Sequence, residues 1–401
     1  MLFTLARFRH SQPRPPFRLG GEFMQLEGYN FLRDAQGAIA LEGKADMFQD
    51  FRSGDQVLVQ VTGFDGETAH CSEAERVVYS EREWLQAPRL HAAEFAKFVN
   101  AVRQFFISRG CNEVFTPTLV PCPGMEPSLE PFSVGRTYLP TSPEIHLKKA
   151  LARGWTDIFE IKSCFRKGEL SAHHEPEFTM LEWYRGFADL EMIIADLKAL
   201  LEHLDTNGFM RQSAPVAVTT FRKLFHEVLD FELKPEATVE DLQGVARRLS
   251  LHSLPDDSFA DLFHRLLIEH IEPRMREMGP LVVRDFPPSM AALAKLTAEG
   301  WADRCEFYWE GLEIANAFNE VNDPLEQKKR WQNDIEERKR LGTSTLAVDP
   351  SLIHALEAGM PPSGGIALGM ERLYMACRGV DEIRELKLFA TAAPVQTRRR
   401  K

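Results

Sequence analysis

Two strand-like segments separated by a short, highly charged loop constrain the fold of this chain most strongly. The segments read DIFEIKSCFR (157–166) and EFTMLEWYR (177–185), and both alternate as a pleated strand requires. Two strands with about ten residues between them are typical of an antiparallel hairpin with a long loop. The sequence therefore predicts such a hairpin, with its charged loop exposed to whatever the protein binds.

The alternation also predicts which side chains of the hairpin share a face. The residues expected on one face of each strand are Ile158, Glu160, Lys162, Cys164 and Arg166 in the first strand, and Phe178, Met180, Glu182 and Tyr184 in the second. If the two faces adjoin, an arginine, several carboxylates and a phenol meet on one surface. An arginine fork suits a phosphate or carboxylate, whereas carboxylates beside a tyrosine suit an ammonium group. The pattern predicts a site for a molecule that carries both signs of charge.

The loop of this hairpin contains two adjacent histidines, which raises the alternative of a metal site. Side chains of His173 and His174 point in different directions, and HHEPE lacks the one-turn spacing of HExxH. Metal ligation by this pair is therefore not favoured. A plain solvated loop accounts for residues 167–171 but not for the regular strands on either side.

Two later segments carry residues that could join this site. GLEIANAFNEVND (311–323) places Glu313 and Glu320 around Asn316, too far apart for one strand face unless the strand turns into a loop or helix. GGIALGMER (364–372) predicts a glycine turn that leads into a helix, where backbone can approach a nucleotide and the helix N-terminus favours anions. Either segment alone is weak evidence for a site.

The rest of the chain shows an order of β-rich, helical and mixed regions. Residues 1–20 are expected to form a disordered tail, 21–86 a small β-rich domain, 87–392 the main domain and 393–401 a basic tail. A helix is predicted from Phe95 to Gly110, followed by a strand at 113–120, whose Pro117 indicates a sheet edge or an interface. Helices are expected over most of 190–278 and over 325–341, and strands at 282–287 and 305–316.

Bulk composition narrows the class of protein. The chain has 401 residues, of which 44% are hydrophobic and 27% charged, with no apolar run long enough to span a membrane. A net charge of −11 argues against general nucleic-acid affinity. Six scattered cysteines without a CxxC pair fit reduced thiols rather than a disulfide framework. These observations predict a cytoplasmic protein without a membrane segment.

Taken together, these segments resemble the catalytic domain of class II aminoacyl-tRNA synthetases. The helix and strand around Pro117, the stretch from Phe165 through TMLEWY, and ALGMERL resemble the three signature motifs of that class, in the same order. PEFTMLEWY and EIANAFNEVND are similar to its lysyl branch, and the resemblance covers about residues 90–390. It implies an α+β fold with an antiparallel sheet flanked by helices, and a homodimer formed through the region of Pro117.

Within that branch the chain resembles the elongation factor P–lysine ligases more closely than the tRNA synthetases. YLPTSPEIHLKKAL follows the ligase wording, and Ala367 stands where the tRNA enzymes usually have glycine, a change that reshapes the pocket toward a β-amino substrate. The chain departs from the pattern at Gly168, which displaces the usual glutamate to Glu169, and at Glu175, where asparagine is common. The β-rich residues 21–86 exceed the minimal ligase and could be an OB-like barrel.

The resemblance implies a set of substrates and roles. The substrates would be ATP with Mg²⁺, lysine or (R)-β-lysine, and elongation factor P as acceptor, with tRNA less favoured. Arg166 and Arg372 would act on the phosphates, and Glu313 and Glu320 would bind the metal. The ATP-binding residues would be Arg166, Lys167, Gly168, Glu169, His174, Glu175, Glu313, Ile314, Gly369 and Arg372. The amino-acid residues would be Ser142, Pro143, Glu144, Tyr184, Asn316, Glu320 and Ala367.

Three alternatives stay open at the level of sequence. A lysyl-tRNA synthetase would share the activation chemistry and differ in its acceptor. A non-catalytic synthetase-like regulator is expected to have lost a phosphate-binding arginine or a metal-binding glutamate, yet Arg166, Arg372, Glu313 and Glu320 are all present. A generic metal hydrolase fits the segments least well.

Overall fold

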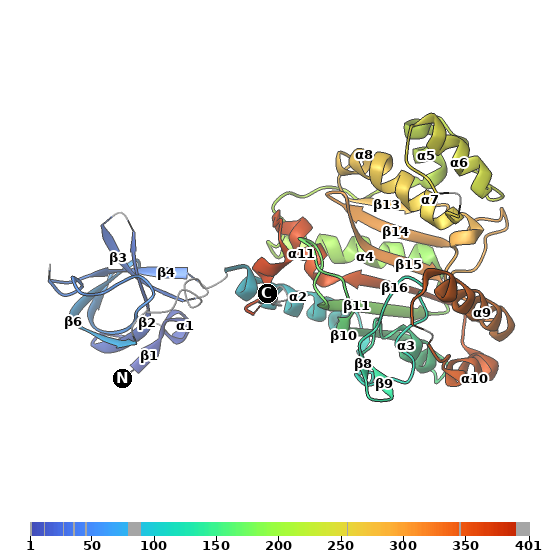
Figure 1. Cartoon of the computed structure of the whole chain (residues 1–401). Coiled ribbons are helices and arrows are strands. Elements are labelled where there is room, and N and C mark those ends of the chain that lie inside the picture. The colour runs from blue at the N-terminus through green and yellow to red at the C-terminus, as the bar shows by residue number, and fades with distance from the viewer. Residues whose placement is uncertain are drawn as a thin grey trace, which may run out of the picture. The chain divides into compact units, whose positions relative to one another are not determined.

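The computed structural model consists of two compact units (Figure 1), of which the first runs to Lys97 and the second begins at Phe98, within helix α2 (Leu90–Ser108). It describes all residues except 1, 12, 27, 35–36, 45, 79–89, 255, 345 and 390–401. Among the residues described, none of the helices has the length and apolar character needed to cross a membrane.

The first unit is a small β-barrel. Its strands are β1 (Leu2–Thr4), β2 (Phe17–Leu26), β3 (Tyr29–Asp34), β4 (Gly37–Glu42), β5 (Gln56–Phe64) and β6 (Thr68–Val78). They pair in the order β1-β2-β3-β4-β6-β5, and an additional β2–β5 pairing closes five of them into a barrel. Val57, Val59 and Val61 alternate into its core. This arrangement is that of the OB-like barrel expected from the sequence.

The prediction of a disordered tail over residues 1–20 is wrong. These residues supply β1, helix α1 (Leu5–Ser11) and the start of β2, and β1 pairs in parallel with β2. Phe8, Phe17 and Leu19 are buried in the barrel core. The segment is ordered because these apolar side chains, spaced among its arginines, bury against the barrel. The predicted boundary at residue 86 and the tail at 393–401 lie outside the described residues.

The second unit is built on an eight-stranded sheet in the order β12-β13-β14-β15-β16-β11-β10-β7. The pairs β12–β13 and β10–β7 are parallel and the other neighbours are antiparallel. The strands are β7 (Asn112–Glu113), β10 (Asp157–Phe165), β11 (Glu177–Gly186), β12 (Ala217–Thr220), β13 (Leu281–Arg284), β14 (Arg304–Trp309), β15 (Leu312–Asn319) and β16 (Ser363–Gly369), with a separate pair β8 (Ser133–Val134) and β9 (Thr137–Tyr138). The predicted hairpin is therefore present as β10 and β11.

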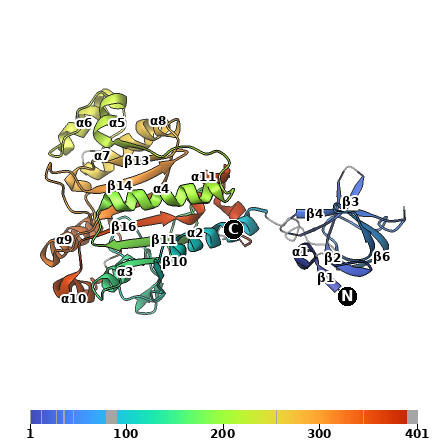
Figure 2. The same ribbon diagram turned by 180° about the vertical axis from the view of Figure 1, so that it is seen from behind.

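Helices flank this sheet, as the α+β prediction required. Besides α2, they are α3 (Glu144–Leu151), α4 (Leu190–Thr206), α5 (Phe221–Leu229), α6 (Val239–Arg248), α7 (Phe259–Leu266), α8 (Glu272–Arg276), α9 (Pro324–Leu341), α10 (Pro350–Gly359) and α11 (Met370–Arg378). Helix α4 lies along one face of the sheet, as Figure 2 shows. Helices α5–α8 gather around a phenylalanine-rich core beside β13. Helix α9 begins at Pro324 after the cap Asp323 and ends at the left-handed Gly342.

Two local predictions are wrong, each for a physical reason. The strand expected through Pro117 ends at Glu113, and Thr116 bonds instead to the Glu160 carboxylate through its N–H and its hydroxyl, both at 2.8 Å. The glycines of GGIALG form the central strand β16 rather than a turn. A Cβ at Gly364 would lie 2.5 Å from Ile193 of α4, so the glycine allows helix and sheet to pack closely.

A candidate active site with an arginine end and an acidic end

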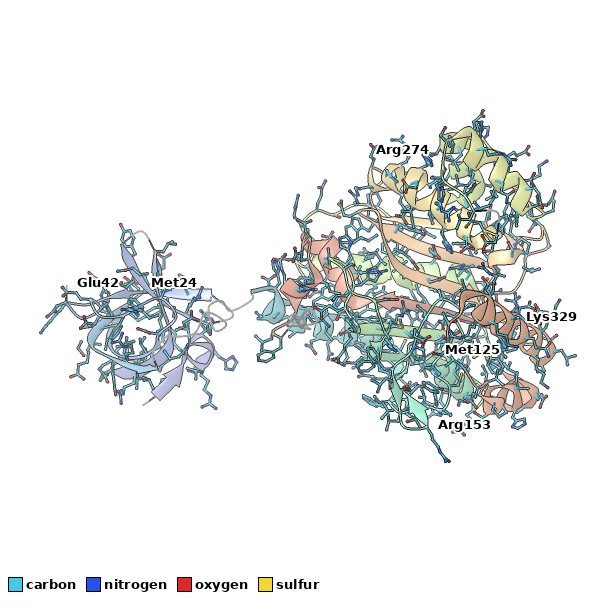
Figure 3. All side chains as sticks on the ribbon, viewed as in Figure 1. Met24, Glu42, Met125, Arg153, Arg274 and Lys329 are labelled. Carbon is cyan, nitrogen blue, oxygen red and sulfur yellow. The ribbon has the colours of Figure 1, made fainter. Side chains whose placement is uncertain are left out.

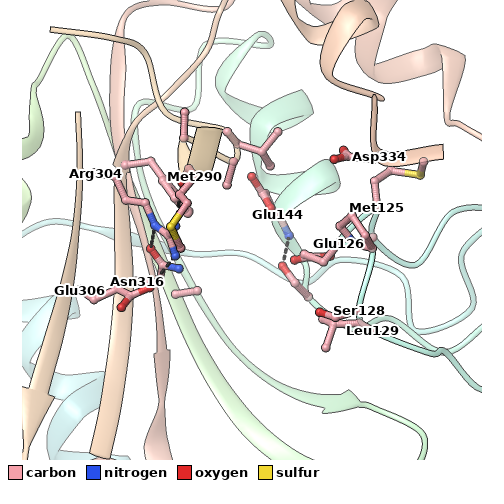
Figure 4. Close-up of a pocket in the computed structure, with 18 of the residues that line it drawn as sticks. Met125, Glu126, Ser128, Leu129, Glu144, Met290, Arg304, Glu306, Asn316 and Asp334 are labelled. Atoms are coloured by element: carbon pink, nitrogen blue, oxygen red, sulfur yellow. Dashed lines mark hydrogen bonds and ion pairs between the residues drawn. The ribbon is translucent and has the colours of Figure 1, made fainter. Parts of the chain in front are cut away.

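The second unit contains a cleft of about 1050 Å³ on the face of the sheet opposite α4. Strands β11, β14, β15 and β16 form its floor, and helices α3 and α9 contribute to its walls. Figure 3 labels two residues of its lining, Met125 and Lys329, and Figure 4 shows the cleft in close-up. Most of the residues predicted for the site line this one cleft.

The register of the sheet explains how distant segments meet there. Glu182 of β11 pairs with Ala367 of β16, which pairs with Asn316 of β15, which pairs with Glu306 of β14. Four strands thus place one residue each in a single row across the floor. The predicted faces of the hairpin also adjoin, since Glu160 lies opposite Glu182. The prediction of one shared surface is confirmed.

Arg166 lies at one end of the cleft with much of its guanidinium available. The group stacks over the ring of Phe178 at 5.0 Å and lies 3.7 Å from the Glu169 carboxylate. Among the described residues, its buried Nε has no hydrogen-bond partner. A guanidinium held by stacking rather than by a close carboxylate is suited to bind an anion.

Arg372 lies near it and is held from two sides. It donates to the backbone oxygen of Glu313 at 2.8 Å and to Nε2 of His174, whose Nδ1 lies 2.8 Å from the hydroxyl of Ser171. Because arginine can only donate, Nε2 must accept, and the ring proton lies on Nδ1. Burial and then the charge of Arg372 lower the pKa of His174 to about 4. His174 is therefore a neutral orienting partner for Arg372.

The opposite end of the cleft is acidic and contains one buried cation. The Lys148 ammonium lies 2.6 Å from Glu144 and 2.6 Å from Glu320. Glu320 is 0% exposed, and its Oε1 lies where a side chain at position 365 would collide with it, at 2.3 Å. Gly365 thus leaves room for this carboxylate beside Tyr184. Glu320 is buried behind the acidic end of the cleft and is not part of the cleft lining.

Further carboxylates surround this end. Ser142 donates to Glu182 at 2.5 Å and Tyr184 donates to it at 3.3 Å. Burial, followed by the charge of Glu144, raises the pKa of Glu182 well above its ordinary value. Burial and the charge of Glu126 likewise raise the pKa of Asp334 to about 7. Carboxylates that repel each other in a buried site favour a cationic ligand.

The structure does not bring the predicted metal pair of Glu313 and Glu320 together in the cleft, because only Glu313 is part of its lining. The Glu320 carboxylate already faces the Lys148 ammonium, which would repel a metal ion. Glu306 fits better beside Glu313, because both line the cleft, although Glu306 also accepts from Arg304 and Tyr308. Burial and then the charge of Glu313 raise the pKa of Glu306 to about 7. In the described part of the chain, no cluster of three potential ligands is present. A cation would therefore rest on two carboxylates and on the oxygens of a bound phosphate.

Not every predicted residue lines the cleft, and some residues that do were not predicted. Glu175, Ile314 and Gly369 line it, whereas Pro143, Lys167 and Gly168 do not. Sequence reasoning missed Arg304, Glu306, Lys148 and Glu126. Arg304 donates to the Asn316 side chain at 3.0 Å and to the Glu306 carboxylate, as Figure 4 shows. Period-two alternation in β14 could have placed Arg304 and Glu306 on one face, but not beside Asn316.

Comparisons with known proteins point to one family. The model of the family tRNA synthetases class II (D, K and N) matches residues 86–393. A protein of Mannheimia succiniciproducens named elongation factor P–(R)-β-lysine ligase is 36% identical over 310 residues, covering 73% of this chain and 93% of the relative. Proteins of the same name from Proteus mirabilis and Vibrio campbellii are 35% and 34% identical, each covering 73% of this chain and 93% of the relative.

Proposed function

The chain belongs to the class II tRNA synthetase family, and on that premise we propose that it is a ligase that modifies elongation factor P. It would activate (R)-β-lysine or lysine with ATP and transfer the product to a lysine side chain of elongation factor P. One observation supports this most directly. A single cleft joins an anion-binding end at Arg166 and Arg372 to an acidic end at Glu144, behind which Glu320 is buried against Lys148.

The first half-reaction would take place at the arginine end. An oxygen of the substrate carboxylate attacks the α-phosphorus of ATP, the bond to the bridging oxygen breaks, and pyrophosphate leaves. Arg166 would contact the carboxylate and the α-phosphate, and Arg372 would hold the γ-phosphate. Glu306 and Glu313 would hold Mg²⁺, which supplies charge neutralisation of the phosphates when bound.

The acidic end would receive the ammonium groups of the amino acid. Glu144 is suited to the amine near the reacting carboxyl, and Glu320 with Tyr184 to the distal ammonium. The methyl group of Ala367 lies in the row between Glu182 and Asn316, where it would narrow the space around the reacting end. This narrowing supports preference for a β-amino substrate.

The second half-reaction forms an amide. The side-chain amine of a lysine in elongation factor P, in its uncharged form, attacks the carbonyl carbon of the adenylate. The carbon–oxygen bond to AMP then breaks, AMP leaves, and the attacking nitrogen loses a proton. The names of the relatives favour this acceptor over tRNA, while the OB-like barrel of the first unit is what favours tRNA as the second candidate.

Removal of Glu320 tests the assignment. Glu320→Ala should raise KM for lysine about 100-fold in ATP–pyrophosphate exchange, because loss of one partner of a buried pair costs about 3 kcal/mol. Glu357→Ala is the control, since Glu357 pairs with Lys328 at the surface. Unchanged lysine activation by Glu320→Ala would contradict the assignment.

We also propose that the enzyme is a cytoplasmic homodimer. Phe115, Leu119 and Trp155 are large apolar side chains exposed on the second unit, with Phe115 84% exposed. Phe115 and Trp155 line one surface hollow, and exposed apolar side chains of this kind support association with a second copy. All six cysteines are free and buried, which fits a reducing compartment.

A further inference from the structure

Lys148 has no role in the chemistry proposed above, yet it lies at its centre. The residue belongs to α3, is 1% exposed, and places one ammonium between Glu144 and Glu320 at 2.6 Å from each. Burial disfavours its charge, but the two carboxylates outweigh burial and raise its pKa. Lys148 is thus a permanent cation inside a substrate pocket.

Each carboxylate has two oxygens, and Lys148 contacts only one of each. It lies against Oε1 of Glu144 and Oε2 of Glu320. Among the described residues, the other oxygen of Glu320 has no hydrogen-bond donor and is buried beside Gly365. A buried oxygen without a donor is costly unless a ligand supplies one. Lys148 therefore leaves Oε1 of Glu320 as an acceptor for an ammonium group of the substrate.

The charge of this cluster matches the proposed substrate. Two carboxylates and one ammonium carry a net charge of −1, and a diamino acid whose carboxylate binds Arg166 brings two ammonium groups to it. Without Lys148, two buried carboxylates would face each other, and one would take up a proton. The other groups that face Glu320 are Lys295 and Tyr184. Those that face Glu144 are Glu182, Tyr184, Glu126 and Asp334.

We propose that Lys148 is a positioning residue for the amino acid, which opposes protonation of Glu320 and holds Glu144 and Glu320 at a fixed spacing so that each receives one substrate ammonium. This inference rests on the proposed function. The role of Lys148 would explain how the site selects a diamino acid, since the carboxylates of Glu144 and Glu320 both pair with its one ammonium nitrogen. A molecule with a single ammonium would leave one of the two acceptors without a donor.

Lys148→Met tests this role, because methionine fills similar volume without charge. Burial raises the pKa of Glu320 and the charge of Lys148 lowers it, so removal of the lysine should favour the protonated form of Glu320 at neutral pH. We expect KM for lysine or (R)-β-lysine in ATP–pyrophosphate exchange to rise at least about tenfold at neutral pH. It should fall again as the pH is raised, whereas kcat changes little.

Lys328→Met is the matched control, since Lys328 also pairs with a glutamate, Glu357, at 2.9 Å but lies half-exposed outside the cleft. Its KM should equal that of the wild type at every pH. A KM for Lys148→Met that is unchanged, or raised equally at all pH values, would overturn the inference. If the wild type catalyses ATP–pyrophosphate exchange neither with lysine nor with (R)-β-lysine, the proposed function itself is rejected.

If Lys148→Met does not fold, the double variant Lys148→Met/Glu320→Gln removes both charges and should fold. The inference predicts that its KM for lysine is raised and independent of pH, because the distal acceptor is uncharged throughout. Wild-type KM in the double variant would overturn the inference.

Discussion

At Gly365 a missing side chain shapes the amino-acid pocket. A Cβ there would lie 2.3 Å from both Glu320 Oε1 and Tyr184 Cε1. Gly365→Ala should therefore displace these groups and raise KM for lysine about tenfold or more, with a smaller effect on KM for ATP. Gly244→Ala is the control, because a Cβ there meets nothing within 4 Å. Equal lysine KM values for the two variants, measured by pyrophosphate exchange, would contradict this account.

His174 makes stability depend on pH in a defined direction. Its pKa in the folded protein is about 4, below the ordinary 6.5, so the unfolded chain binds a proton over that range and the folded protein does not. The free energy of unfolding should fall as the pH drops from 6.5 toward 4. His174→Gln, which can still accept from Arg372 but does not titrate, should lose less over the same range. Denaturant unfolding at several pH values measures the difference, and identical slopes would refute the assignment.

Single residues were predictable where the alternation of one strand fixes them. Arg166, Tyr184 and Glu182 follow from the hairpin alone. Lys148 and Glu306 do not, because their importance depends on which strand or helix lies opposite. The same reason applies to the glutamates predicted for the metal, since nothing in the sequence shows that Glu320 faces Lys148.

Helix α9 holds the loop that carries Glu126 against the cleft. Arg338 of α9 is buried and donates to the backbone oxygens of Glu126 at 2.8 Å and Leu129 at 2.9 Å. Arg338→Met leaves the Leu129 carbonyl without this donor and the Glu126 carbonyl with only the Leu129 N–H at 3.2 Å, so it should lower stability by about 3 kcal/mol and raise KM for lysine. Arg340→Met, whose partner Glu337 is partly exposed on the same helix, should cost less than about 1 kcal/mol. Comparable losses in thermal unfolding would contradict this role.

Elements were predictable where periodicity and caps agree. The hairpin, the helices α2 and α9, and the helical stretch after Leu190 were all expected. The strand at Pro117 and the glycine turn at 364–369 were not correctly predicted, because tertiary contacts decided them. The prediction of a tail over residues 1–20 was wrong because it gave weight to the arginines and not to the apolar residues between them, such as Phe8, Phe17 and Leu19, which are buried in the barrel core.

The proposed association of two copies can be tested at the exposed apolar side chains. If the exposed side chains of Phe115, Leu119 and Trp155 lie in the dimer interface, Phe115→Glu should place a charge in an apolar contact and yield monomers. Leu254→Glu is the control, since Leu254 is likewise an exposed apolar residue, and it should leave the assembly unchanged. Sedimentation velocity distinguishes the outcomes, and a monomeric wild type would contradict the proposal.

The choice of acceptor distinguishes an enzyme that modifies elongation factor P from one that charges tRNA. The purified full chain would be given ATP, Mg²⁺ and labelled lysine or (R)-β-lysine, with unmodified elongation factor P in one reaction and tRNA in another. We expect label on elongation factor P and none on tRNA, and the OB-like barrel would then be accessory to the catalytic unit. Label on tRNA alone would contradict it and would make the chain a tRNA-charging enzyme.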